Sequence, residues 1–196
     1  MTAAYSCAAA NSAPAVSAIS ASVTVDEGQT AANTGTVSDP DGDVVALSAS
    51  AGTVVNNGDG TWSWSFNTTD GPPQSQTVTI TANDGHGGTS QTTFGLTVNN
   101  VVPMVGAISA PVDPQAVNTT VNASAPFADP GTGDTHTAVW DWGDGNTSVG
   151  TVTESNGAGS VAGSHTYATP GVYTVQLTVT DDDEGVGVQL RVCGGL

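Results

Sequence analysis

Aspartate recurs at matching places in the two halves of this chain, within short segments rich in Gly, Pro and Asn. The first half carries it at residues 38–43 and 83–85, and the second half at 128–134 and 181–185. Arg191 is the only Lys or Arg, against 18 acids. Carboxylates that meet without a basic partner repel one another, and a bound hard cation, most often Ca²⁺, relieves that repulsion. The pattern therefore predicts calcium sites built from loops.

The composition favours an extended, strand-rich chain. Charged residues make up only 10%, and Gly, Ser, Thr, Ala, Val and Asn dominate over the usual helix formers. The net charge of −17 argues against binding to nucleic acid or to an anionic membrane surface, because little is present to neutralise phosphates. No segment is long and apolar enough to predict membrane insertion.

Short alternating runs separated by turn residues predict strands in the first half, and no window predicts a helix. These runs cover residues 23–25, 44–47, 62–66, 78–81 and 94–98. The segment 57–60, Asn-Gly-Asp-Gly, predicts a hairpin turn before the third run.

The pattern then restarts, which indicates an internal repeat. Residues 11–16 correspond to 100–105, and residues 77–85 correspond to 174–182. The repeat predicts an all-β protein made of two tandem Ig-like antiparallel β-sandwiches. The expected divisions are an N-terminal tail over 1–10, a first module over 11–100 and a second module over 101–196.

Alternate loops of an antiparallel sandwich share one end of the module, so the acidic loops should meet where the chain enters it. The oxygen donors expected in the first module are Asn11, Ser12, Asp39, Asp41, Asp43 and Asp84. Those expected in the second are Asn99, Asn100, Asp129, Asp134, Asp181 and Asp183. Donors from several segments suit the tolerant coordination of Ca²⁺ better than the strict octahedron of Mg²⁺.

The second module resembles a PKD (polycystic kidney disease) domain. The resemblance rests on Val-Trp-Asp-Trp-Gly-Asp-Gly at 139–145, His-Thr-Tyr at 165–167 and Pro-Gly-Val-Tyr-Thr-Val at 170–175. It implies calcium ligands at Asn100, at Asp129 and at one of the acids 181–183. A partner acid is expected two residues after Asp129, but this chain has Gly131 there.

The first module resembles bacterial cadherin-like or Ig-like surface repeats, through residues 25–28, 38–43 and 82–85. The resemblance implies that Glu27 joins Asp39, Asp41 and Asp84 at the metal. It also implies an extracellular or cell-surface location, since such modules occur in adhesins, surface filaments and secreted hydrolases.

The aromatic residues and histidines allow two interpretations. Trp62, Trp64 and Phe66 share one strand face, as do Trp140 and Trp142, which predicts core packing, with a sugar-binding platform as the alternative. His86, His136 and His165 are dispersed, and neither a zinc-binding helix nor a nucleophile motif is present, so no enzyme activity is expected. Asp59 and Asp70 are expected to serve turns only.

The two cysteines, Cys7 and Cys193, lie near opposite ends of the sequence. If two sandwiches follow one another end to end, the distance excludes a disulfide within one chain. A head-to-tail neighbour would bring its Cys7 to Cys193 and propagate a filament. Unpaired thiols, or partners in a longer polypeptide, are the alternatives.

Together these features predict a calcium-stabilised structural or adhesive rod unit of a prokaryotic extracellular filament, stalk or surface protein. Its expected partners are other copies or neighbouring repeats, joined head to tail, and a cell-surface or glycan ligand. The alternative is a pair of accessory modules that bind polysaccharide or protein for a secreted hydrolase.

Overall fold

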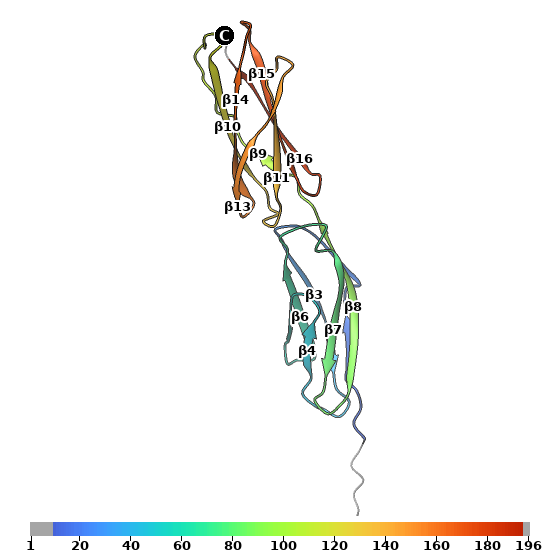
Figure 1. The fold of residues 1–196 in the computed structure, drawn as a ribbon. Helices are drawn as coiled ribbons and strands as arrows, with labels where there is room; N and C mark the ends of the chain where they lie inside the picture. The colour runs from blue at the N-terminus through green and yellow to red at the C-terminus, as the bar shows by residue number, and fades with distance from the viewer. Residues whose placement is uncertain (1–9, 194–196) are drawn as a thin grey trace, which may run out of the picture. The chain divides into compact units, whose positions relative to one another are not determined.

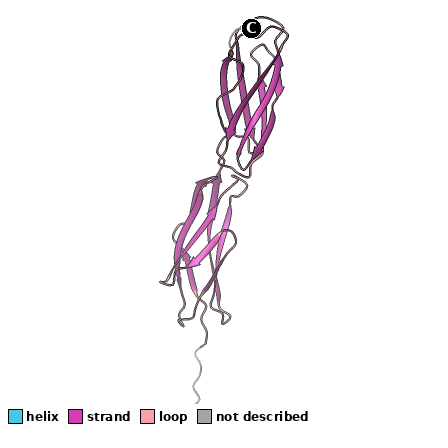
Figure 2. Ribbon diagram, turned by 90° about the vertical axis from the view of Figure 1, so that its left-hand side faces the viewer, coloured by secondary structure: helices cyan, strands magenta, loops and turns pink. Residues whose placement is uncertain are grey.

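The computed structural model describes residues 10–193, which consist of strands and loops without a helix (Figure 2). The predicted all-β class and the tandem antiparallel sandwiches are confirmed. Across residues 10–193 we find no helix that could span a membrane. Most of the predicted tail, including Cys7, lies outside the described residues.

The chain divides into two compact units, which are described separately. The first unit comprises the residues up to Val25, Thr30–Asn67 and Ser75–Thr97. The second comprises Asp26–Gln29, Thr68–Gln74 and the residues from Val98 onward. Two short segments from the first half of the sequence therefore belong, by their contacts, to the second unit.

Two four-stranded antiparallel sheets form the first unit (Figure 1). One sheet has the order β1 (Ala15–Ala18), β3 (Thr30–Ser38), β6 (Thr61–Asn67), β5 (Thr53–Asn56). The other has the order β2 (Ser22–Asp26), β8 (Thr89–Asn99), β7 (Gln76–Asn83), β4 (Ala46–Ala49). The ring of Trp64 on β6 packs edge-on against Phe94 on β8, with centroids 4.9 Å apart. The inner faces of the two sheets thus meet in a sandwich core.

The second unit repeats this architecture with a larger aromatic core. One sheet has the order β9 (Met104–Val105), β10 (Thr120–Ala128), β14 (Ala158–Thr166), β13 (Thr151–Ser155). The other has the order β12 (Thr147–Val149), β11 (His136–Asp141), β15 (Tyr173–Asp181), β16 (Val186–Cys193). Trp140, Val161 and Leu177, from β11, β14 and β15, are fully buried in one cluster.

Strand β3 was not predicted, because three of its four inward-facing positions carry small or polar residues. Its nine residues alternate between exposed and buried, with Ala31, Asn33, Gly35 and Val37 facing inward. A Cβ at Gly35 would clash with the ring of Trp62 and with the backbone of Ser17. The large neighbouring ring, rather than a large residue on β3 itself, fills this part of the core.

All four tryptophans are core residues, which confirms that interpretation over an aromatic platform. Trp62, Trp64, Trp140 and Trp142 are each at most 2% exposed. The indole nitrogen of Trp64 donates to the carbonyl of Ala51 at 2.6 Å, inside the first unit. Rings buried to this extent present no face on which a sugar could stack.

The strands deliver the acids to loops at their ends. Asp39 follows β3 directly, Asp84 follows β7 and Asp129 follows β10, while Asp181 is the last residue of β15. Each carboxylate therefore starts from a rigid, paired strand end, so the sheets determine which loops can approach one another.

Replacing Tyr167 with Phe tests the polar part of the second core. The Tyr167 hydroxyl is buried and donates to the carbonyl of Trp142 at 3.0 Å. We expect Tyr167→Phe to lower the free energy of unfolding by about 1–2 kcal/mol, because that carbonyl loses its donor. Urea unfolding followed by fluorescence would measure it. Tyr173→Phe is the control, since its hydroxyl bonds Thr169 at an exposed site; equal effects in the two variants would contradict the assignment.

Candidate metal centre

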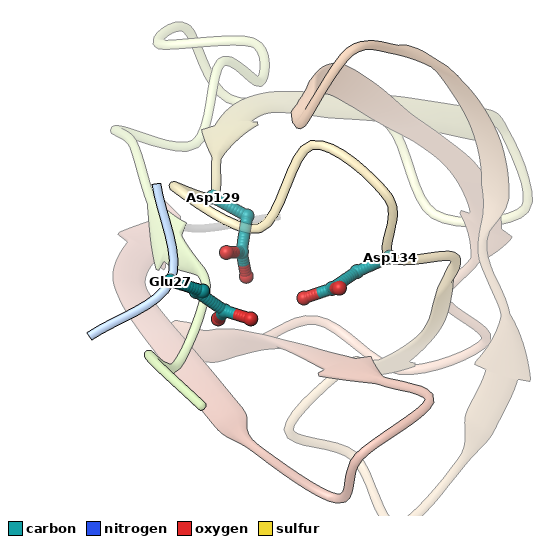
Figure 3. Close-up of side chains that lie close together, drawn as sticks. All are labelled: Glu27, Asp129 and Asp134. Carbon is teal, nitrogen blue, oxygen red and sulfur yellow. The ribbon is translucent and has the colours of Figure 1, made fainter. Parts of the chain in front are cut away.

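Three buried acids of the second unit converge on one point. Glu27, Asp129 and Asp134 each offer a carboxylate oxygen, and these oxygens lie within 4.8 Å of one another. Their side chains point toward a common space from two segments, Glu27 from the residues after β2 and the two aspartates from the loop after β10 (Figure 3). The three residues, here called the acidic centre, are 1%, 6% and 7% exposed respectively. Like charges this close and this buried require protons or a cation.

Backbone amides hold Glu27 in place directly after β2. Its Oε2 accepts a hydrogen bond from the amide of Gly71 at 2.8 Å, and its Oε1 accepts one from Val101 at 2.6 Å. Its own amide donates to the carbonyl of Asn99 at 3.0 Å. Burial raises the pKa of Glu27 above its usual value, and these two amides oppose that effect only in part.

Asp129 is oriented by a histidine for which the sequence predicted no role. One carboxylate oxygen accepts from the amide of Gly131 at 2.8 Å, and the other lies 3.3 Å from Nε2 of His136. Nδ1 of the same ring lies 2.7 Å from Glu154. The buried imidazole thus links two carboxylates and fixes the direction of Asp129, as outer-shell histidines and carboxylates do around metal ligands.

Asp134 is the residue that most clearly lacks a partner. Both of its carboxylate oxygens are buried, and neither has a hydrogen-bond partner. Burial raises the pKa of Asp134 to about 7, and the nearby charges of Glu27, Asp129, Asp70 and Asp182 add to that rise. A buried carboxylate with no donor is costly unless a proton or a metal ion satisfies it.

A second group of acids shares Asp134. Oxygens of Asp70, Asp134 and Asp183 also lie within 4.8 Å of one another. Oδ1 of Asp70 is buried without a partner. Asp70 was expected to serve a turn only; the structure instead places it in the second unit, where Gly133 donates to the carbonyl of Thr69 at 2.8 Å.

The remaining predicted donors of the second unit divide into three cases. Asp181 caps its own turn, accepting from the amides of Asp183 and Gly185, and it also accepts from the side-chain amide of Asn100 at 3.1 Å. The side-chain carbonyl of Asn100 is buried without a partner, so it is available as a ligand. The side chain of Asn99 donates to Asp26 instead.

In the first unit the predicted residues do come together, but more loosely. Asn11 donates to Asp84 at 2.9 Å, and the amide of Ser12 donates to Asp41 at 2.7 Å. Asp39 uses one oxygen to accept from the amides of Asp41 and Asp43, while its other oxygen is buried and unpartnered. Within residues 10–193, three-carboxylate groups at the 4.8 Å spacing occur only in the second unit.

The remaining predicted member of this first-unit group is also engaged. Asp43 lies 3.3 Å from Nδ1 of His86. Asp84 uses its other oxygen to accept from the amides of His86 and Gly88. These loops are therefore held together by their own hydrogen bonds.

The placement of Glu27 with Asp39, Asp41 and Asp84 was wrong. Glu27 precedes the nine-residue strand β3 and Asp39 follows it, so the strand separates them by about 30 Å. Glu27 instead belongs with Asp129 and Asp134.

There Glu27 accepts the backbone hydrogen bond that corresponds to the one Asp41 accepts in the first unit. The amide of Val101 donates to it as the amide of Ser12 donates to Asp41. A side chain at Gly131 would clash with Asp134. The glycine at position 131, where an acid was expected, therefore indicated that an acid from another segment lies beside Asp129.

Replacing Asp134 with Asn should stabilise the metal-free protein at high pH. The pKa of Asp134 is raised in the folded protein, so the folded state favours the protonated carboxyl. The resulting stabilisation is complete below about pH 4 and is lost as the pH rises through about 7. In EDTA, Asp134→Asn should raise the free energy of unfolding by about 1–3 kcal/mol at pH 8 and by less at pH 5. Denaturant unfolding at both pH values measures this.

The control for that experiment is Asp59→Asn, which removes an exposed turn carboxylate. The hydroxyl and amide of Thr61 lower the pKa of Asp59, so its loss should give no stabilisation. A destabilised Asp134→Asn protein at pH 8 in EDTA would show that Asp134 has a donor in solution.

Comparison with known proteins assigns both modules. Models of known families match a bacterial Ig domain at residues 11–97 and a PKD domain at residues 100–191. No curated protein matches this chain. Among solved structures, the PKD1 domain of Vibrio anguillarum Epp is 28% identical, covering 48% of this chain and 93% of that chain, with a TM-score of 0.36.

Two further solved domains are similar at lower identity. The PKD1 domain of the Vibrio cholerae metalloprotease PrtV is 24% identical over 47% of this chain and 94% of its own, with a TM-score of 0.35. The PKD domain of an M14-like peptidase from a Thermoplasmatales archaeon is 24% identical over 48% and 97%, with a TM-score of 0.36. PKD and bacterial Ig domains are non-catalytic modules typical of extracellular or surface proteins. This chain therefore carries a bacterial Ig domain at residues 11–97 followed by a PKD domain at residues 100–191.

Proposed function

We propose that this chain is a calcium-stabilised structural or adhesive unit of an extracellular surface protein, with Ca²⁺ held at the acidic centre. The observation that supports this most directly is Asp134, a buried carboxylate whose two oxygens have no partner beside two further buried acids. A divalent cation would satisfy those oxygens and remove the repulsion among the three charges.

The donor set favours Ca²⁺ over other ions. The available ligands are carboxylate oxygens from Glu27, Asp129 and Asp134. Zn²⁺ would prefer nitrogen or sulfur, and both nitrogens of His136 already face carboxylates. Irregular oxygen donors from several segments suit the flexible shell of Ca²⁺, whereas Mg²⁺ requires near-octahedral order.

The ion would act by joining segments that are distant in sequence. Glu27 lies in Asp26–Gln29, and its carboxylate accepts from Gly71 and Val101, while Asp129 and Asp134 lie in the loop after β10. A cation that binds this arrangement only in the native state stabilises it by mass action. The same proposal extends to the first unit through the unpartnered oxygen of Asp39, although the carboxylates there are further apart.

A structural role agrees with the placement of the histidines. Each histidine lies within 3.3 Å of a carboxylate. His86 faces Asp43, and His165 faces Asp144. His136 lies between Asp129 and Glu154. The alternative, accessory modules that bind polysaccharide, required exposed tryptophan rings, and these rings are buried.

Head-to-tail assembly through a disulfide stays a prediction. Cys7 lies outside the described residues. Cys193 is buried, and that burial raises the pKa of its thiol, which makes the reactive thiolate scarcer. Pairing with another chain would require this strand end to open.

Removing calcium should lower the melting temperature of the second unit. At a Ca²⁺ concentration about 100 times Kd, binding contributes about 2.7 kcal/mol, or a shift of about 10 °C for a domain of this size. Calorimetry of the full chain in Ca²⁺, Mg²⁺ and EDTA would measure it. We expect Glu27→Gln to weaken calcium binding at least about tenfold, since ligand charge sets affinity.

Asp59→Asn is again the matched control, because it removes one exposed carboxylate from a turn of the first unit and should leave the shift unchanged. A melting profile that is identical in Ca²⁺ and EDTA would refute the proposed function.

A further inference from the structure

We propose that the second unit binds two cations rather than one, with Asp134 bridging them and with Asp70 and Asp183 forming the second position. This inference rests on the proposed function, because it adds a neighbouring ion to the acidic centre. The geometry behind it is that Asp134 belongs to both groups of three carboxylates, whose oxygens lie within 4.8 Å of one another in each group.

The two oxygens of Asp134 provide the bridge. Both are buried and unpartnered, so neither is committed to a protein donor. A carboxylate can bind one ion through each oxygen, and oxygen-rich shells of Ca²⁺ tolerate a shared ligand. If a single ion lay among Glu27, Asp129 and Asp134, it would leave the other group of acids without compensation.

Asp70 is the residue that points to the second position. It lies in Thr68–Gln74, which packs in the second unit, and the amide of Gly133 donates to the carbonyl of its neighbour Thr69. A Cβ built at Gly133 would lie 3.1 Å from that of Asp70, so the loop carrying Asp134 passes close to it. Although Asp70 is only partly buried, its Oδ1 is inaccessible and has no partner. A carboxylate oxygen of Asp70 also lies within 4.8 Å of one of Asp134, so an acid with an unpartnered oxygen stands beside the shared residue.

The charge of the cluster favours two ions. The five acids of the two groups carry five negative charges when ionised. One divalent ion would neutralise two of these charges, and two ions would neutralise four. The only Lys or Arg side chain, Arg191, donates to the carbonyls of Ile108 and Ala110 and so is engaged elsewhere. The negative charge that remains after the first ion binds would attract a second cation.

Counting bound calcium in full-length variants tests this inference. Native mass spectrometry and calorimetric titration with Ca²⁺ alone would compare the wild type with Asp70→Asn, Asp183→Asn, Glu27→Gln and Asp134→Asn. We expect Asp70→Asn and Asp183→Asn each to bind one ion fewer than the wild type and to keep the tighter ion. Asp134→Asn should lose both ions, and Glu27→Gln should weaken the ion at the acidic centre. Any ion held by the first unit cancels in these differences.

Asp141→Asn is the matched control, since it removes one exposed carboxylate at the far end of β11 from His136 and should not change the count. If Asp70→Asn and Asp183→Asn match the wild type in count and affinity, the second ion is refuted while the proposed function stands. The second ion is refuted equally if these variants weaken all binding without reducing the count. If the wild type binds no calcium, both proposals fail.

Discussion

Mutual repulsion among buried carboxylates is the constraint that organises the second unit. Glu27, Asp129 and Asp134 are more than nine-tenths buried, so little water screens their charges. Backbone amides of Gly71, Val101 and Gly131 donate to two of these acids but not to Asp134. Burial and the neighbouring acids accordingly raise the pKa of Asp134 to about 7, so the charge of this cluster depends on pH near neutrality.

The sequence predicted the architecture where alternating side chains are large. The runs around Trp62, Val78 and Phe94 became β6, β7 and β8, and the repeat correctly indicated two sandwiches. Strand β3 was not predicted from the sequence, because Ala31, Asn33 and Gly35 face inward and such residues give no alternating hydrophobic pattern. The fold class was thus predictable, while individual strands were predictable only where they supply the core themselves.

The candidate site was predictable only in part, for a similar reason. The repeated pairs Asn11 with Asp84 and Asn100 with Asp181 followed from loop topology, and both contacts are present. Glu27 was assigned to the wrong group because the unrecognised strand β3 separates it from Asp39. Asp70 and His136 could not be placed, since their roles come from tertiary neighbours distant in sequence. The one local signal was Gly131, where an expected acid is missing.

The second unit is discontinuous in sequence, and this matters for how such modules are exchanged in evolution. Its short segments Asp26–Gln29 and Thr68–Gln74 lie within the stretch matched as a bacterial Ig domain. Recombination that moved residues 100–191 as a self-contained cassette would leave Glu27 and Asp70 behind. The pair of domains, rather than either one alone, is then the unit on which selection for this acidic cluster can act.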